Sequence, residues 1–495
     1  MRPEAFMGFT RSGLLRYGSI AGTSATGEDT PVLSAVMNRL TARRVGRTAR
    51  LVAQGMLGGR ATESVTRFHG VRVVDTGSQG AKRMRLIATA GCRRGVSSYT
   101  GVLGRHAFEY PLRMGLSTLG LRVMVSASDL ISRYLGLEWS SLCLYVLAAI
   151  RRGSAYSTEA GLKYFIMGSV ASGFLLFGSS LVYGMTGTVQ FGDRGRRRMG
   201  LSNEEGHGLI GVGVARVRSA FLFKLAVAPF HAWSPDVYEG SPTPSTIYFA
   251  VVPKMAMARV VIRLCYGPFA ERFDLTQSMR RMGSVRSRGV AALAARAQRR
   301  VKRFRAYSAI GHMGYMLLGV SSGSLEGVQG SRVYRIIYRI MSLNVWLAAM
   351  AVARQGEGST SRTSAKYRTD LGGLNQVNPF LALTLALSVM SMAGIPPRAG
   401  FMAKMWVFFA AMSQSLVLYS RFAVLTSCVG AYYYLRWVKI MYFDAVTPTT
   451  GHARAEVDVW TSRVRGVTLG LRVGLLRVPG PLRLRTHRMA LALCR

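Results

Sequence analysis

The chain has little cysteine, few acidic residues and very little lysine, and these shortages exclude several classes of protein. Its five cysteines are scattered and never form a CxxC pair, which excludes a secreted disulfide scaffold. Acidic residues number 22 against 65 basic ones, a formal net charge of +43, and only eight of the basic residues are lysines. A disordered polycation is also excluded, because 25 Met, 21 Phe and 21 Tyr provide ample apolar surface to bury. A membrane protein or a large basic nucleic-acid binder remains.

Familiar catalytic motifs are lacking as well. The sequence offers no Ser-His-Asp arrangement, no zinc-ligand spacing and no phosphate-binding loop. The glycine-rich stretch Gly208-Leu-Ile-Gly211-Val-Gly213 has no strand before it, so we interpret it as a site of close helix packing.

Both ends of the chain lack long apolar runs. Before Arg122 the longest run without a charged residue is Tyr17–Gly27, eleven residues, whereas a bilayer core of about 30 Å needs about 20 apolar residues. We therefore expect an Arg-rich N-terminal region (1–122) and an Arg-rich C-terminal region (445–495) without clear spans. An amphipathic mitochondrial targeting segment would explain part of residues 1–27.

The middle of the chain is different. Residues 164–192 carry no charge for 29 positions, residues 371–397 for 27 and residues 306–325 for 20. Shorter runs of this kind also occur in soluble cores, but a soluble helix of 29 residues normally keeps a polar face. We predict an all-α, polytopic membrane protein. Its expected helices cover 123–150, 161–187, 207–233, 243–266, 286–298, 304–323, 333–353, 376–397, 401–418 and 422–443.

Four ionisable residues interrupt these apolar runs: Glu138, Lys224, Lys254 and Lys404. A charge at membrane depth costs roughly 2.5–3.5 kcal/mol on insertion scales, so such residues are rare and usually functional. A buried lysine can load and release a proton when a carboxylate partner moves.

Prolines mark two of the same places. Pro229 follows Lys224, and Pro396-Pro397 precedes Lys404. A proline removes a backbone hydrogen bond and opens a helix, which a membrane tolerates only against protein or water. Each kink alone is compatible with simple packing, but two broken helices with a nearby lysine are typical of an internally duplicated transporter.

Four further residues are weaker candidates for a proton path: Lys163, Lys302, His231 and His312. Histidine titrates near neutrality and can relay protons. The alternatives are a hydrogen-bonded core position for His312 and an interfacial, snorkelling position for Lys163 and Lys302.

The same segments resemble the proton-pumping, antiporter-like (Mrp-related) membrane subunits of respiratory complex I, with the subunit 2 group nearest. The most specific likeness is the stretch Phe223–Pro244, which contains Lys224-Leu-Ala-Val-Ala-Pro229-Phe-His231-Ala-Trp-Ser-Pro-Asp236. The likeness covers about residues 123–444. Further matching stretches are Leu135-Gly-Leu-Glu138, Ser157–Phe165, Pro253-Lys254, Val301-Lys302-Arg303, Ala306–Tyr315, Gly394-Ile-Pro-Pro397, Gly400-Phe-Met-Ala-Lys404 and Tyr433–Phe443.

This resemblance implies two inverted five-helix repeats with discontinuous helices, at 123–266 and 267–444. It pairs Glu138 with Lys224, and it implies proton translocation through Glu138, Lys224, Lys254 and Lys404, coupled to NADH:ubiquinone electron transfer. No cofactor is expected in this chain, because flavin, iron–sulfur clusters and ubiquinone belong to partner subunits. The expected partners are other membrane-arm subunits and the lipid bilayer, with no nucleic acid. The expected location is the mitochondrial inner membrane, or alternatively a bacterial cytoplasmic membrane.

Three alternatives stay open at this point. One is a subunit of an Mrp-type cation/proton antiporter or of a membrane hydrogenase. A second is a degenerate, non-functional copy, because Arg398 stands where the family is apolar and Arg305 interrupts the matching stretch Lys302-Arg-Phe-Arg305-Ala306. The third is a basic RNA- or lipid-binding protein, which salt rather than detergent would release from membranes.

Overall fold

A computed structural model describes most of the middle of the chain and little of its ends. The predicted targeting segment lies outside the described residues, and so does the predicted C-terminal region apart from two glycines. The described residues are 65–67, 71–74, 76–97, 109–191, 204–270, 273–355, 362–364, 366–444, 466 and 470.

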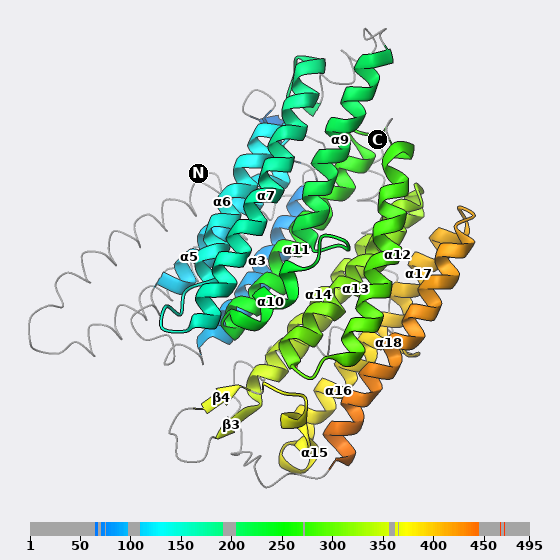
Figure 1. Cartoon of the computed structure of the whole chain (residues 1–495). Coiled ribbons are helices and arrows are strands. Elements are labelled where there is room, and N and C mark those ends of the chain that lie inside the picture. Colours follow the sequence, from blue (N-terminus) through cyan, green and yellow to red (C-terminus); the bar gives the residue numbers. More distant parts are fainter. Residues whose placement is uncertain are drawn as a thin grey trace, which may run out of the picture. The chain divides into compact units, whose positions relative to one another are not determined.

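Helices dominate the described chain, which confirms the predicted helical class (Figure 1). Two short antiparallel hairpins, which the sequence did not predict, accompany them: β1 (Val65–Arg67) with β2 (Arg72–Val74), and β3 (Ala353–Gln355) with β4 (Arg362–Ser364). The helices are α3 (Thr76–Ser97), α5 (Glu109–Ser126), α6 (Leu130–Ala148), α7 (Ala155–Thr186), α9 (Glu204–Leu225), α10 (Trp233–Gly240), α11 (Thr243–Tyr266), α12 (Phe273–Ala297), α13 (Val301–Ser321), α14 (Leu325–Ala351), η3 (Thr369–Leu371), α15 (Leu374–Val377), α16 (Pro379–Ala393), α17 (Ala399–Met412) and α18 (Val417–Phe443).

The chain divides into two compact units. Unit 1 comprises Met1–Ala220 and Gly240–Val260, and unit 2 comprises Phe221–Glu239 and Val261–Arg495. The chain therefore passes between the units within α9, at the end of α10 and within α11.

In unit 1, α5, α6 and α7 pack in sequence order, and α3 packs on α5 (Figure 1). Helix α6 begins where the Asp129 carboxylate accepts hydrogen bonds from the backbone N–H and the hydroxyl of Ser132, at 3.1 and 3.0 Å. Small residues let α5 and α6 approach closely, since a Cβ added to Gly136 would lie 2.6 Å from the Met124 nitrogen.

We expect Gly136→Ala to destabilise the chain, because the new methyl group would meet backbone rather than a movable side chain. Overpacking of this kind costs about 1–3 kcal/mol. Gly173→Ala in α7 is the matched control, because a Cβ there meets nothing within 4 Å. Replacing a helical glycine by alanine should stabilise α7 by up to about 1 kcal/mol. Thermal denaturation in detergent measures both, and equal shifts for the two variants would contradict the close α5–α6 packing.

In unit 2, α12 packs along α13, α14 contacts α16 and α17, and α18 packs on α12 and α16. The α12–α13 contact includes a hydrogen bond of 2.8 Å from the Ser284 hydroxyl to the Gly314 carbonyl. Helix α16 has strong boundary signals: Asn378 accepts from the Leu381 nitrogen, Pro379 opens the helix and Gly394 ends it.

Several predicted helix boundaries were wrong. The predicted helix 123–150 is interrupted between α5 and α6, and α5 already begins at Glu109. The predicted helix 207–233 ends at Leu225, whereas the predicted helix 286–298 extends back to Phe273. Charge-free runs gave misleading limits because unit 1 and unit 2 accommodate arginines inside helices, and Arg122 and Arg288 are buried.

The arginines also limit how many helices meet a length-and-hydropathy criterion for crossing a bilayer. Among the described helices, one does so, α7 (Ala155–Thr186), and Pro379–Ala393 and Ala399–Met412 are shorter apolar helices. The other predicted spans carry too many charges or too few apolar residues to qualify by that measure.

Candidate functional site

The ammonium group of Lys404 lies at the C-terminal end of helix α16, inside unit 2. Its side chain comes from α17, is 6% exposed, and donates to the Ala393 carbonyl at 2.7 Å and to the Ser427 hydroxyl at 2.8 Å. Ala393 is the last residue of α16, whose final carbonyls have no partner within the helix. The ammonium group therefore lies at the negative end of the α16 dipole, which favours a cation there.

Glycine at position 394 is needed for this arrangement for two reasons. Its φ of +84° lies in the left-handed region, where other residues are strained. An added Cβ would lie 3.0 Å from the Lys404 Nζ atom, so a side chain would displace the lysine. The segment from Gly394 through Pro396-Pro397 thus ends α16 and leaves room for Lys404 beside the break.

His312 lies in a row of buried hydroxyl groups in the same unit. Its Nδ1 atom is 2.7 Å from the Tyr334 hydroxyl, and its Nε2 atom is 3.3 Å from the Tyr434 hydroxyl. The Tyr434 hydroxyl also hydrogen-bonds to Ser308. Both ring nitrogens have partners, so His312 has the hydrogen-bonded core position considered from the sequence. The same contacts form a continuous hydrogen-bonded path between α13, α14 and α18.

Tyr315 lies between this row and Lys404. The Lys404 Nζ atom is 5.0 Å from the centre of the Tyr315 ring, a cation–π contact. The Tyr315 ring centre is in turn 6.2 Å from that of Tyr334. Polar and aromatic side chains therefore extend from the end of α16 to His312 through the interior of unit 2.

The two arginines that depart from the family pattern both have hydrogen-bond partners. Arg305 is 4% exposed and donates to the Ser342 hydroxyl at 3.2 Å and to the Met392 sulfur at 2.9 Å. Arg398, within the break between α16 and α17, donates to the Leu387 carbonyl at 3.0 Å. Their positive charges are accommodated by local acceptors.

Lys224 occupies the last turn of α9, which ends one residue later. The carbonyls of this helix end are satisfied locally: that of Phe223 accepts from the Ala226 nitrogen at 2.9 Å and from the Trp233 indole nitrogen at 3.1 Å. Lys224 is half-buried. Its charge lies at the negative end of the α9 dipole, as Lys404 lies at the end of α16. The Nδ1 atom of His231, beyond the break, is 3.2 Å from the Pro229 carbonyl.

In unit 1, Glu138 is held by hydroxyl groups. Its carboxylate accepts hydrogen bonds from Ser172 on α7 and, at 3.3 Å, from Ser141 one turn along α6. Glu138 is half-buried, whereas Lys254 on α11 is 2% exposed. The predicted pairing of Glu138 with Lys224 joins residues of different units and stays a prediction.

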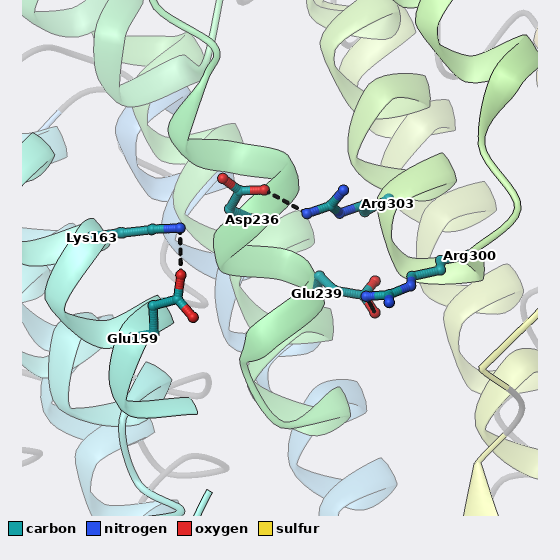
Figure 2. A network of polar contacts seen from close by, with 6 residues as sticks. All are labelled: Glu159, Lys163, Asp236, Glu239, Arg300 and Arg303. Atoms are coloured by element: carbon teal, nitrogen blue, oxygen red, sulfur yellow. Dashed lines mark hydrogen bonds and ion pairs between the residues drawn. The ribbon is translucent and has the colours of Figure 1, made fainter. Parts of the chain in front are cut away.

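Lys163 and Lys302 are more exposed than Lys254 and Lys404. Lys163 forms an ion pair of 2.6 Å with Glu159 one turn earlier on α7, and both side chains are about half exposed (Figure 2). This geometry agrees with the interfacial alternative for Lys163, and exposed pairs of this kind contribute little to stability. Lys302 is half-buried in the first turn of α13.

Sequence reasoning assigned no role to a pair of acidic residues on α10. Asp236 forms an ion pair of 2.9 Å with Arg303, and Glu239 forms one of 3.1 Å with Arg300, all within unit 2. Figure 2 labels these four residues and marks the Asp236–Arg303 pair. These ion pairs connect the start of α13 to the segment after the α9 break. No spacing rule could have found them, because about 60 residues separate the partners.

Among the described residues, no group of three or more His, Cys, Asp or Glu side chains could hold a metal ion. The chemistry that the described site offers is proton exchange between lysine, histidine, carboxylate and hydroxyl groups.

Comparison with known proteins decides the family. Residues 127–430 match the family described as "NADH:quinone oxidoreductase/Mrp antiporter, TM". The chain belongs to this antiporter family. It is 40% identical over 394 residues to NADH-ubiquinone oxidoreductase chain 2 of Marchantia polymorpha, covering 79% of this chain and 78% of that relative. It is 39% identical over 406 residues to NADH-quinone oxidoreductase subunit N of Paramagnetospirillum magneticum, covering 80% of each.

A chain of known structure has the same fold. Respiratory complex I from Thermus thermophilus contains a chain that superposes with a TM-score of 0.76 at 27% identity, covering 97% of this chain and 98% of that one. The family indicated by the Phe223–Pro244 stretch is thus confirmed. The chain is a membrane protein of the respiratory chain.

Proposed function

We propose that this chain is a proton-translocating subunit in the membrane arm of complex I. It would couple NADH:quinone electron transfer in partner subunits to proton movement through its own buried lysines and carboxylate. The observation that carries the proposal is the buried ammonium of Lys404, bonded to the end of α16 and to Ser427. The relatives' names support the complex in which it acts.

Lys404 has the properties that a proton carrier needs. Lysine exchanges its proton readily when buried, whereas arginine does not release one at physiological pH. The polar and aromatic row from Tyr315 to His312 provides groups through which a proton could continue, since hydroxyls and imidazole both donate and accept hydrogen bonds. In this proposal Lys404 loads and releases a proton as its contacts at the α16 end change.

The other site residues have matching roles in the proposal. Lys224, at the end of α9, Lys254 and Glu138 carry protons together with Lys404. Relay positions are Lys163, Lys302, His231 and His312, and among them His312 has the best-connected hydrogen bonds.

The proposed architecture is a pair of inverted five-helix repeats, residues 123–266 and 267–444. Each repeat would contain one discontinuous helix with a lysine at the break, a design common in transporters. The ends of α9 near Pro229 and of α16 near Pro396-Pro397 support this proposal.

Redox chemistry is assigned to the partner subunits. We propose that flavin, iron–sulfur clusters and ubiquinone are bound there, and that this chain contacts other membrane-arm subunits and lipid. The mitochondrial inner membrane is the proposed location.

Lys224→Ala tests the proposal directly. We expect the complex to assemble near normally but NADH-driven proton uptake into proteoliposomes to fall by about 100-fold or more, since 100-fold is the lower end of what a proton-transfer group contributes. Lys224→Arg should also impair uptake, because arginine keeps its proton.

Lys366→Ala is the control for Lys224, since Lys366 is exposed on a loop of the same unit. It should leave proton uptake unchanged. Wild-type proton uptake in a fully assembled Lys224→Ala complex would rule the proposed role out. Copurification without flavin and iron–sulfur subunits would instead favour an Mrp-type antiporter.

A further inference from the structure

A cavity of about 440 Å³ opens at the turn between α6 and α7 in unit 1. Two arginines line it, Arg113 from α5 and Arg152 from the turn, and the rest of its wall is largely apolar. The apolar part includes Val146 on α6 and Leu162 and Phe165 on α7. The cavity thus combines two cationic groups with a largely apolar wall.

The length of α7 indicates where this cavity lies in a bilayer. The helix has 32 residues and is about 48 Å long, which exceeds the roughly 30 Å hydrocarbon core. Its charge-free part begins at Tyr164, directly after the exposed Glu159–Lys163 ion pair. The first two turns of α7 and the preceding turn with Arg152 therefore lie at headgroup level. Lipid phosphates occupy the same level.

The exposed surface continues from the cavity toward the membrane interior. Leu162 and Phe165 are 60% and 49% exposed, and Ile166 and Val170, further along α7, are also exposed. On α6, Leu142 is exposed one turn before Val146. An acyl chain that starts in the cavity would follow this apolar face without a break.

We propose that the cavity binds an anionic phospholipid, with its phosphate between Arg113 and Arg152 and one acyl chain along Val146, Leu162 and Phe165. Charge complementarity selects this occupant. Arg113 forms an ion pair of 2.5 Å with the half-exposed Glu109, but a guanidinium has five N–H donors, so donors are left for a phosphate. Arg151 and Arg152 are both exposed and add an excess of positive charge at the rim.

An anionic lipid fits better than a zwitterionic lipid or a protein helix. A zwitterionic headgroup brings its own cation into a rim that already holds three arginines. A membrane helix from another subunit would offer no anion to neutralise the arginines, and basic pockets of this kind between membrane helices bind anionic headgroups. The inference depends on membrane embedding and does not depend on proton translocation.

Native mass spectrometry of the full-length chain in detergent tests this site, with phosphatidylglycerol or phosphatidylcholine added at equal ratios. We expect the wild-type chain to retain phosphatidylglycerol preferentially. Removing both charges with Arg113→Gln and Arg152→Gln should weaken phosphatidylglycerol binding about 25-fold, at about fivefold per arginine near a membrane surface. Arg152→Lys should keep most of the binding, because it keeps the charge.

Arg296→Gln is the matched control, since it removes an exposed arginine in the last turn of α12 that does not line the cavity. It should leave lipid binding unchanged. If the double variant melts at a lower temperature than the wild type, the single variant Arg152→Gln is tested instead. Arg152 lies on an exposed turn, so its replacement should not disturb the fold. Equal binding of the two lipids, unchanged binding in the variants, or displacement of the lipid by inorganic phosphate alone would each overturn the proposal.

Discussion

Lys404→Ala is expected to abolish most proton translocation while the complex still assembles. The substitution removes the only ammonium hydrogen bond to the α16 end that the described structure gives, and it removes the donor to Ser427. We expect proton uptake per NADH oxidised to fall by about 100-fold or more, since 100-fold is the lower end of what a proton-transfer group contributes. The measurement is proton uptake by proteoliposomes that contain the assembled complex.

Two further substitutions separate proton transfer from packing at this position. Lys404→Arg keeps a cation at the end of the α16 dipole but cannot release its proton, so uptake should stay low. Lys439→Ala removes an exposed lysine near the end of α18 and should have no effect. If Lys404→Arg pumped like the wild type, Lys404 would be a structural cation rather than a proton carrier.

The sequence was sufficient to identify Lys404 as a candidate, and the reason is energetic. A charge in an apolar run is costly and therefore rare, so the sequence alone is enough to notice it. The proline pair before Lys404 marks the helix break. The lysine's acceptors could not be predicted in the same way. Ser427 is 23 residues away on another helix, and its hydroxyl carries no signal in a sequence rich in serine.

The surroundings of His312 show a second limit. The sequence left a core position and a proton relay both open, because a histidine at the edge of an apolar run is compatible with either. The partners that define its environment, Tyr334 and Tyr434, come from α14 and α18. The sequence does not show which face of each helix turns toward His312, because that depends on packing. Tyrosine is also apolar enough to be predicted as an ordinary core residue, so its hydroxyl is not noticed as a partner.

Helix limits were the least predictable part of the fold. Counting charge-free runs hides a helix whenever an arginine lies inside it, and α12 contains five arginines in its last 18 residues. Arg280 is buried there and donates to the Cys265 sulfur at 3.4 Å. A buried arginine with local acceptors costs less than an isolated charge, so the helix continues through it.

Glu138→Gln is expected to lower proton uptake by about 100-fold or more, because an amide cannot take up a proton in the carboxylate's place. The fold should be unaffected: glutamine has nearly the same shape, and its oxygen can still accept the hydrogen bond from Ser172. Glu138→Asp should retain part of the activity, since it keeps the carboxylate but shortens its reach toward α7. Proton uptake in proteoliposomes and assembly on native gels measure the two properties separately.

Glu159→Gln is the matched control for Glu138, since it also removes a carboxylate from unit 1. Glu159 is more than half exposed and its ion pair with Lys163 lies on the surface, so proton uptake should stay at the wild-type level. A double-mutant cycle of Glu138→Gln with Lys224→Ala then tests the pairing predicted from sequence. Groups that act together show coupling energies of about 0.5–3 kcal/mol, whereas independent groups are additive. Strict additivity, with Glu138→Gln as harmless as Glu159→Gln, would make Glu138 a packing residue that fixes α6 to α7 through Ser172.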